Sequence, residues 1–149
     1  MSQSRHLSRI VVMQTLYEWD FRPESKVEDI LHRNFTEFEG QVDQVYARKV
    51  VEGTIASKDS IDQLIIKAAP DWPIEQVAMI DKNLLRIAIF ELLYDQEEEV
   101  PPKVSINEAV ELGKQFGSES SSKFINGVLG TIYKDHAKKL EPRDLNAPK

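Results

Sequence analysis

Hydrophobic residues recur at steps of three and four positions along almost the whole chain. This is the period of an amphipathic helix that turns one face toward a core. No segment alternates apolar and polar residues for long enough to predict a strand, so the pattern predicts an all-α protein. The expected helical segments are 4–20, 27–40, one that begins at 42, one that begins at 73 or 74, 81–94, 105–117, and one that begins within 118–122 and ends at Pro142. Residues 61–68 either continue the helix that begins at 42 or form a separate helix after a break near 57–60.

The segment 81–94 differs from the others because it is apolar around nearly its whole circumference. Such a helix is buried on all sides, so we expect it at the centre of a bundle. Ser105 and Glu108 form an S-x-x-E capping box, which predicts the start of the next helix, and Gly117 predicts its end. Residues 141–149 are expected to be a frayed tail.

The composition is that of one globular domain over residues 1–149, with 41% hydrophobic residues, 30% charged residues and a net charge of −6. The chain has no cysteine, which excludes disulfides, Cys-ligated zinc, iron–sulfur clusters and thiol catalysis, and fits a reducing compartment. It shows no signal segment and no apolar run near the ~20 residues of a membrane span. We therefore expect a cytoplasmic protein without a membrane anchor.

Both ends of the chain are basic relative to its acidic middle, an asymmetry found in nucleic-acid-binding proteins. Arg5 and Arg9 are four residues apart, so they share one face of the first expected helix, with His6 beside them. Two interpretations stay open at this point. The three residues are either a short stripe that grips phosphates or stacked bases, or an ordinary solvated face.

No arrangement of residues predicts an enzyme, a metal site or a cofactor. His6, His32 and His136 have no histidine or carboxylate partner at the spacing of helical metal ligands. Ser120 and Lys123 match the S-x-x-K pattern of some acyl-transfer enzymes, but the rest of that set is missing, and helix capping is favoured. No phosphate-binding loop or dinucleotide fingerprint is present.

Glycine and tryptophan positions are better explained by packing than by ligand binding. Gly127 and Gly130 form a G-x-x-G pattern within an apolar helical stripe, which predicts close helix–helix contact. Trp19 and Trp72 could stack on bases, but packing in the core or against a helix end is more common for tryptophan.

Three stretches go beyond composition: 84–94 (LLRIAIFELLY), 104–117 with INEAVELGKQFG, and 123–132 with KFINGVL. With Arg9 and the QTLY sequence of 14–17, they make the chain resemble the NusB family of bacterial transcription antitermination factors, in order from about Arg5 to Ile132. The resemblance implies an all-α bundle of about seven helices in two packed helical subdomains. It also implies a non-enzymatic factor that binds the boxA segment of nascent ribosomal RNA transcripts together with ribosomal protein S10, also called NusE, and acts through them on the RNA polymerase antitermination complex.

The family often opens with an arginine-rich segment, of which this chain keeps only Arg5, His6 and Arg9. With so few cations the salt-dependent part of RNA binding should be small. An alternative is therefore a protein-interaction module with little RNA binding of its own. A second candidate RNA-binding group lies around the junction of the last two helices, where serines and lysines line a helix N-terminus, although ordinary capping explains them equally well. Its members are Lys114, Ser118, Ser120 and Lys123.

The resemblance also places Tyr17 and Asp81 in the surface that meets S10. Tyrosine is a common interface anchor, and an acidic chain would complement a basic ribosomal protein. The alternatives are that Tyr17 belongs to the core and that Asp81 caps the central helix.

Overall fold

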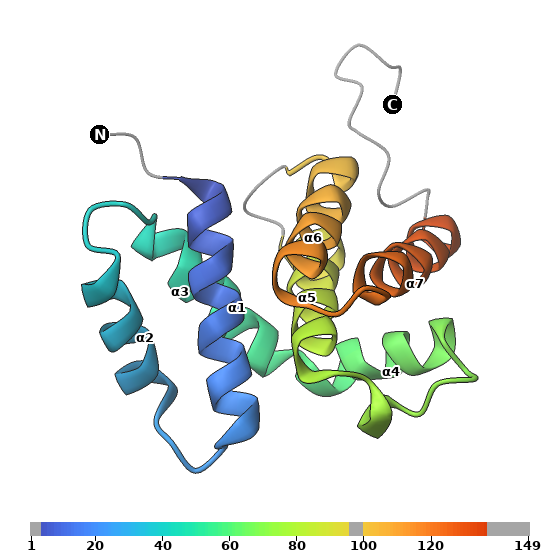
Figure 1. Cartoon of the computed structure of the whole chain (residues 1–149), viewed down its shortest axis with the longest axis horizontal. Helices are drawn as coiled ribbons and strands as arrows, with labels where there is room; N and C mark the ends of the chain where they lie inside the picture. Colours follow the sequence, from blue (N-terminus) through green and yellow to red (C-terminus); the bar gives the residue numbers. More distant parts are fainter. Residues whose placement is uncertain (1–3, 96–99, 137–149) are drawn as a thin grey trace.

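The computed structural model describes residues 4–95 and 100–136, which form a series of helices joined by short turns (Figure 1). The expected tail at 141–149 and the stop at Pro142 lie outside the described residues. Two short elements of other helical geometry, the 3₁₀ turn η1 and the π-helical turn η2, stand before and after α5. The elements are α1 (Arg5–Phe21), α2 (Val27–Glu37), α3 (Gln44–Ala56), α4 (Lys58–Ala68), η1 (Ile74–Gln76), α5 (Met79–Ile89), η2 (Phe90–Tyr94), α6 (Pro102–Phe116) and α7 (Ser121–Asp135).

Helices α1, α2 and α3 form one side of the molecule, and α4 to α7 form the other (Figure 1). Helix α5 contacts α1, α3, α4, α6 and α7, so it joins the two halves. Its side chains from Leu84 to Ile89 are all buried, which confirms the expected central helix. The all-α fold in two packed helical groups is confirmed as well. In the part of the chain that the structure describes, no helix is long and apolar enough to cross a membrane.

Helix α6 begins one turn earlier than the capping box predicts. Pro102 occupies its first turn, where a proline loses no hydrogen bond and already has a helical φ. Ser105 is therefore inside the helix, where it is buried and donates its hydroxyl to Glu91. The capping interpretation of Ser105 is wrong, whereas Gly117 does end the helix as predicted.

The glycines of α7 do not mediate helix packing, contrary to the sequence-based interpretation. Gly127 and Gly130 are exposed, and a Cβ added at either would meet no atom within 4 Å. The buried stripe of α7 runs through Ile125, Val128, Leu129 and Ile132, so the glycines fall outside it. Close approach occurs instead on α3, where a Cβ added at Gly53 would lie 2.2 Å from Cε1 of Phe90.

Trp72 also differs from the expectation of core packing, because 60% of it is exposed. Pro70 and Pro73 flank it in the connection between α4 and η1. There its ring forms an edge-to-face contact with Phe124, with ring centroids 6.3 Å apart and an interplanar angle of 78°. Trp19 is half-buried near the end of α1.

The two glycine environments predict opposite effects of the same substitution. Gly53→Ala should lower the free energy of unfolding by about 1–3 kcal/mol, because the buried Phe90 ring must move. Gly127→Ala, the matched control in open space on α7, should raise it by about 0.5–1 kcal/mol through helix propensity. Urea unfolding of both variants measures the difference. Equal effects would contradict the close contact at Gly53.

Candidate RNA-binding and protein-binding surfaces

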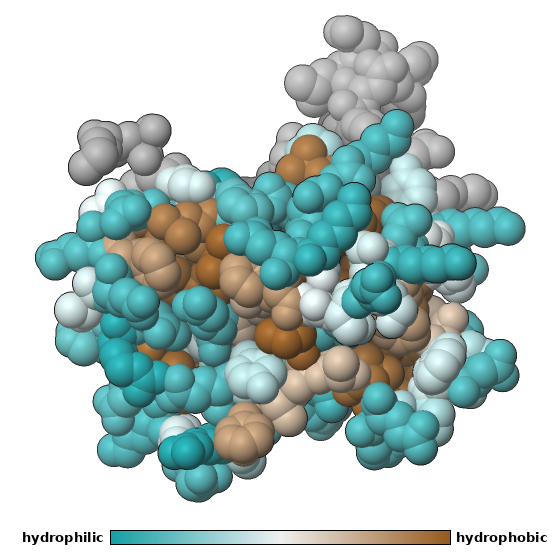
Figure 2. Space-filling view, viewed as in Figure 1, coloured by the Kyte–Doolittle hydropathy of each residue, from teal (hydrophilic) through white to brown (hydrophobic). Residues whose placement is uncertain are grey.

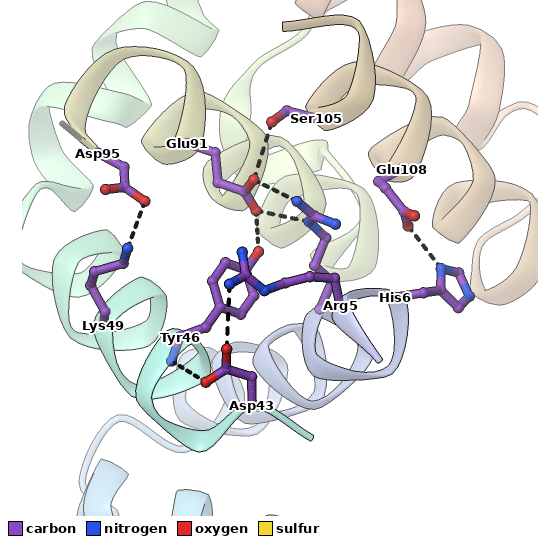
Figure 3. A network of polar contacts seen from close by, with 10 residues as sticks. Arg5, His6, Asp43, Tyr46, Lys49, Glu91, Asp95, Ser105 and Glu108 are labelled. Atoms are coloured by element: carbon purple, nitrogen blue, oxygen red, sulfur yellow. Dashed lines mark hydrogen bonds and ion pairs between the residues drawn. The ribbon is translucent and has the colours of Figure 1, made fainter. Parts of the chain in front are cut away.

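The first turn of α1 presents two of the expected RNA-binding residues at the surface. Ser4 caps the helix by accepting a hydrogen bond from the Leu7 amide at 3.0 Å. The Arg5 guanidinium lies 4.0 Å above the centre of the Tyr46 ring, and its Nη2 is 3.3 Å from Oδ2 of Asp43. His6 turns the other way, toward α6, with Nδ1 2.8 Å from Oε2 of Glu108 (Figure 3).

Arg9 is not part of this surface, which corrects its assignment as an RNA contact. It is 4% exposed, and its Nε and Nη2 each donate to one oxygen of Glu91 at 2.9 Å. Burial alone would lower the pKa of Arg9, but the hydrogen bonds and negative charge of Glu91 outweigh it and raise that pKa above its ordinary value. Arg9 is therefore a permanently charged partner of a buried carboxylate. The sequence shows its charge but not that partner, which is 82 residues away.

The Glu91 carboxylate joins four elements of the fold. Besides Arg9 of α1, it accepts hydrogen bonds from the Tyr46 hydroxyl of α3 at 2.5 Å and from the Ser105 hydroxyl of α6 at 3.1 Å (Figure 3). Burial and the charge of Glu91 raise the pKa of Tyr46 well above its ordinary value, so the phenol stays a neutral donor. We call Arg9, Tyr46, Glu91 and Ser105 the Glu91 cluster.

The second expected RNA-binding group lies on the surface where α6 ends and α7 begins. Lys114, Ser118, Ser120 and Lys123 are all exposed. The Ser118 and Ser120 hydroxyls are 3.3 Å apart, and Ser120 makes no capping hydrogen bond with its side chain. The buried Ser121 instead accepts from the Ser118 amide at 2.8 Å. The serines therefore form a polar turn at a helix N-terminus.

Helix α6 contacts the first group through Glu108 and carries one member of the second, Lys114. His6 reaches α6 at Glu108, six residues before Lys114, which corresponds to about 9 Å of helix rise. That the two groups bind one RNA remains a prediction.

A third surface is a groove lined by the second half of α1, by α2, by the start of α5 and by the end of α6. Three exposed aromatic side chains line it: Tyr17 is 39% exposed, Phe21 61% and Phe116 37%. Figure 2 shows apolar side chains reaching the surface between lower α1 and the α6–α7 turn. We call this groove, which has a volume of about 440 Å³, the aromatic groove. It is lined by Met13, Gln14, Tyr17, Glu18, Phe21, Arg33, Asn34, Glu37, Ile80 and Phe116.

The structure rejects a core role for Tyr17, whose ring faces this groove. Phe116 is the last residue of α6, and its ring is partly exposed. Phe21 is likewise the last residue of α1. The turn after a helix leaves the last residue of that helix partly uncovered. An aromatic residue at a predicted helix end therefore indicates a partly exposed ring, and the sequence contains this signal.

The structure contradicts one of the two interpretations of Asp81, that it caps the central helix. It lies in the first turn of α5, whose N-cap is Ala78, so it is not the cap, although a negative charge there is favourable to the helix dipole. It is only 7% exposed, so it does not present its carboxylate broadly at the surface. Its Oδ1 is buried without a hydrogen-bond partner among the described residues, beside the groove residue Ile80.

Comparison with known proteins adds to this geometry. The NusB family model matches residues 6–134. The transcription antitermination protein NusB of Chloroflexus aggregans is 43% identical over 133 residues, covering 89% of this chain and 88% of its own. That of Dehalococcoides mccartyi strain CBDB1 is 42% identical over 145 residues, covering 97% and 99%.

Solved structures agree with the sequence comparison. NusB of T. maritima superposes with a TM-score of 0.83 at 34% identity, over 93% of this chain and 96% of that one. A NusB chain from a complex of antitermination factors NusB and NusE with dsRNA superposes with a TM-score of 0.76 at 27% identity, over 88% and 96%. On its helical order, its sequence and its backbone, the chain belongs to the NusB family.

Proposed function

We propose that this chain is a transcription antitermination factor that binds boxA RNA of nascent ribosomal RNA transcripts together with S10, and acts without catalysis. One observation carries the proposal: helix α1 presents Arg5 and His6 in its first turn and exposed aromatic rings in its last two turns. The same helix thus offers two partners chemically different surfaces. The structural similarity to a NusB chain solved with NusE and dsRNA supports this pairing.

For RNA, we assign Arg5 and His6 to one contact and the turn between α6 and α7 to another. Arginine and lysine bind phosphate oxygens, and a helix N-terminus adds backbone donors. The residues of the second contact are Lys114, Ser118, Ser120 and Lys123. Because few cations take part, we expect weak RNA binding by this chain alone and stronger binding when S10 shares the RNA.

For S10, we assign the aromatic groove. Partly exposed aromatic rings are frequent binding hot spots, and Tyr17, Phe21 and Phe116 surround one concave surface. Asp81, which follows the groove residue Ile80 in the sequence, is assigned to the same contact by the resemblance to the NusB family.

An interaction module with little RNA binding of its own is the second candidate. It is favoured by the burial of Arg9, which removes that cation from the surface, and by the pairing of Arg5 with Asp43 and of His6 with Glu108. These contacts offset much of the positive charge at the start of α1.

Binding of a boxA-like RNA, measured by gel shift with and without S10, separates the two candidates. We expect Arg5→Glu to weaken RNA binding by about 1–3 kcal/mol, roughly 5-fold to 150-fold, because few phosphates are involved. Lys26→Glu, the same charge change at the exposed N-cap of α2, is the control and should have little effect. Unchanged RNA affinity of the Arg5 variant would favour the interaction module.

Binding of S10, measured by calorimetry, tests the aromatic groove. Tyr17→Asp should weaken it by about 2 kcal/mol or more, roughly 30-fold, while the melting temperature stays close to that of the parent because the ring is partly exposed. Val45→Asp places the same charge on another exposed apolar residue, on α3, and should leave S10 binding intact. Equal affinities of the two variants for S10 would refute the groove assignment.

A further inference from the structure

The side chain of Arg5 is held between two groups of α3. Its guanidinium covers the Tyr46 ring at 4.0 Å, and its Nη2 points to Oδ2 of Asp43 at 3.3 Å. Asp43 is also the N-cap of α3, because its Oδ1 accepts the Tyr46 amide at 3.0 Å. The same carboxylate therefore fixes the start of α3 and one edge of the guanidinium, while 39% of the Arg5 side chain remains exposed.

The Tyr46 ring is itself immobilised from below. Its hydroxyl donates to Glu91 at 2.5 Å, and that carboxylate is held in turn by the bidentate Arg9 and by Ser105. Only 1% of Tyr46 is exposed. A neutral phenol ring with a fixed plane offers its negative π face to a cation above it.

We propose that Tyr46, supported by the Glu91 cluster, is a positioning residue that orders the Arg5 guanidinium for an RNA phosphate. The inference rests on the proposed RNA contact of Arg5. A free arginine loses much rotamer freedom when it grips a phosphate, and a guanidinium already stacked and tethered loses less. The structure thus compensates for the small number of cations at this end of α1 by ordering the one that faces the RNA.

This role explains why so many polar groups are buried behind one surface arginine. A buried ion pair by itself adds little to stability compared with apolar packing. Here its carboxylate also accepts the hydroxyl that sets the plane of the ring under Arg5. Arg9, although buried, therefore acts on RNA binding through Glu91 and Tyr46.

A double-mutant cycle on RNA binding in the presence of S10 tests the proposal. Tyr46→Leu removes the ring face, and we expect RNA affinity to fall about threefold to tenfold. In the Arg5→Ala background the same substitution should cause no further loss. Tyr46→Phe keeps the ring but loses the bond to Glu91, so it should lose less RNA affinity than Tyr46→Leu.

The melting temperature and S10 affinity of each variant separate positioning from a merely structural role. Both Tyr46 variants should melt at lower temperature and bind S10 like the parent, whereas Tyr46→Leu should lose more RNA affinity than Tyr46→Phe. If Tyr46→Leu does not fold, Asp43→Asn is the second variant: it keeps a capping side chain, removes the charge beside Arg5, and should also lose affinity only when Arg5 is present.

Each remaining outcome is decisive. Equal losses with and without Arg5 overturn the positioning role, as does parental RNA affinity of Tyr46→Leu, or of Asp43→Asn where that variant replaces it. If Arg5→Ala itself leaves RNA affinity unchanged, the proposed RNA contact of Arg5 fails, and the positioning role fails with it. If Arg5→Ala weakens binding and the Tyr46 and Asp43 variants do not, the positioning role alone fails.

Discussion

Glu91→Gln should lower the free energy of unfolding by about 3–5 kcal/mol, because it leaves the Arg9 guanidinium buried without a counter-charge. The four hydrogen bonds that reach the carboxylate come from α1, α3 and α6, so all three contacts weaken at once. Urea unfolding followed by circular dichroism measures the loss.

Two further variants make this expectation specific. Glu108→Gln removes the charge of the carboxylate that contacts His6 at the surface and should cost no more than about 1 kcal/mol. The double variant Arg9→Met with Glu91→Leu removes both buried charges and should regain much of the loss, because an apolar pair carries no desolvation penalty. A Glu91→Gln protein as stable as the Glu108→Gln protein would show that the buried pair contributes little.

Arg86→Met, in the last turn of α5, should have an effect of similar size. The guanidinium donates to both oxygens of Asp62 at 2.8 and 2.9 Å and to Oδ2 of Asp20 at 2.9 Å, and its side chain is 4% exposed. Burial would lower the pKa of Arg86, but Asp62 and Asp20 raise it overall. Without this cation Asp20 loses its counter-charge, whereas Asp62 keeps that of Lys58 3.2 Å away, so we expect a loss of about 3 kcal/mol, at the lower end for a broken buried pair.

Thermal unfolding of Arg86→Met beside Arg48→Met tests this expectation. Arg48 pairs with Glu28 and Glu52 at the surface of α3, so its replacement should change the melting temperature little. Amide hydrogen exchange should also speed up in the last turn of α1, where Asp20 loses its partner. Unchanged exchange there would contradict a link between Arg86 and α1.

Local pattern predicts most of the helical architecture. The all-round apolar stretch at 81–94 marks the central helix, and Gly117 marks the end of α6. The break expected at 57–60 falls at Ser57, which ends α3 and precedes α4. These features depend on residues within a few positions of each other, which is the range over which hydrophobic period and capping act.

The features that could not be predicted depend on residues distant in the sequence. From the sequence Arg9 is expected to be a surface cation, because its contact with Glu91 is not visible there. Ser105 is expected to be a helix cap, because the sequence pattern does not show that the helix begins a turn earlier, at Pro102. Tyr17 and Asp81 came from the resemblance, whereas the groove beside them is formed by α1, α2, α5 and α6 together. A linear pattern does not show which helix ends meet.

The two ion pairs that α1 makes with α5 and η2 have opposite polarity, which restricts how the chain can assemble. Arg9, near the start of α1, meets the anion Glu91, whereas Asp20, near the end of α1, meets the cation Arg86. If α1 packed in the reverse direction, Arg9 would approach Arg86 and Asp20 would approach Glu91, so both buried contacts would become repulsive. A slip of α1 by one turn would move Arg9 by about 5.4 Å and break its bidentate contact. The charge order along two helices thus discriminates against misaligned packings that apolar side chains alone would tolerate.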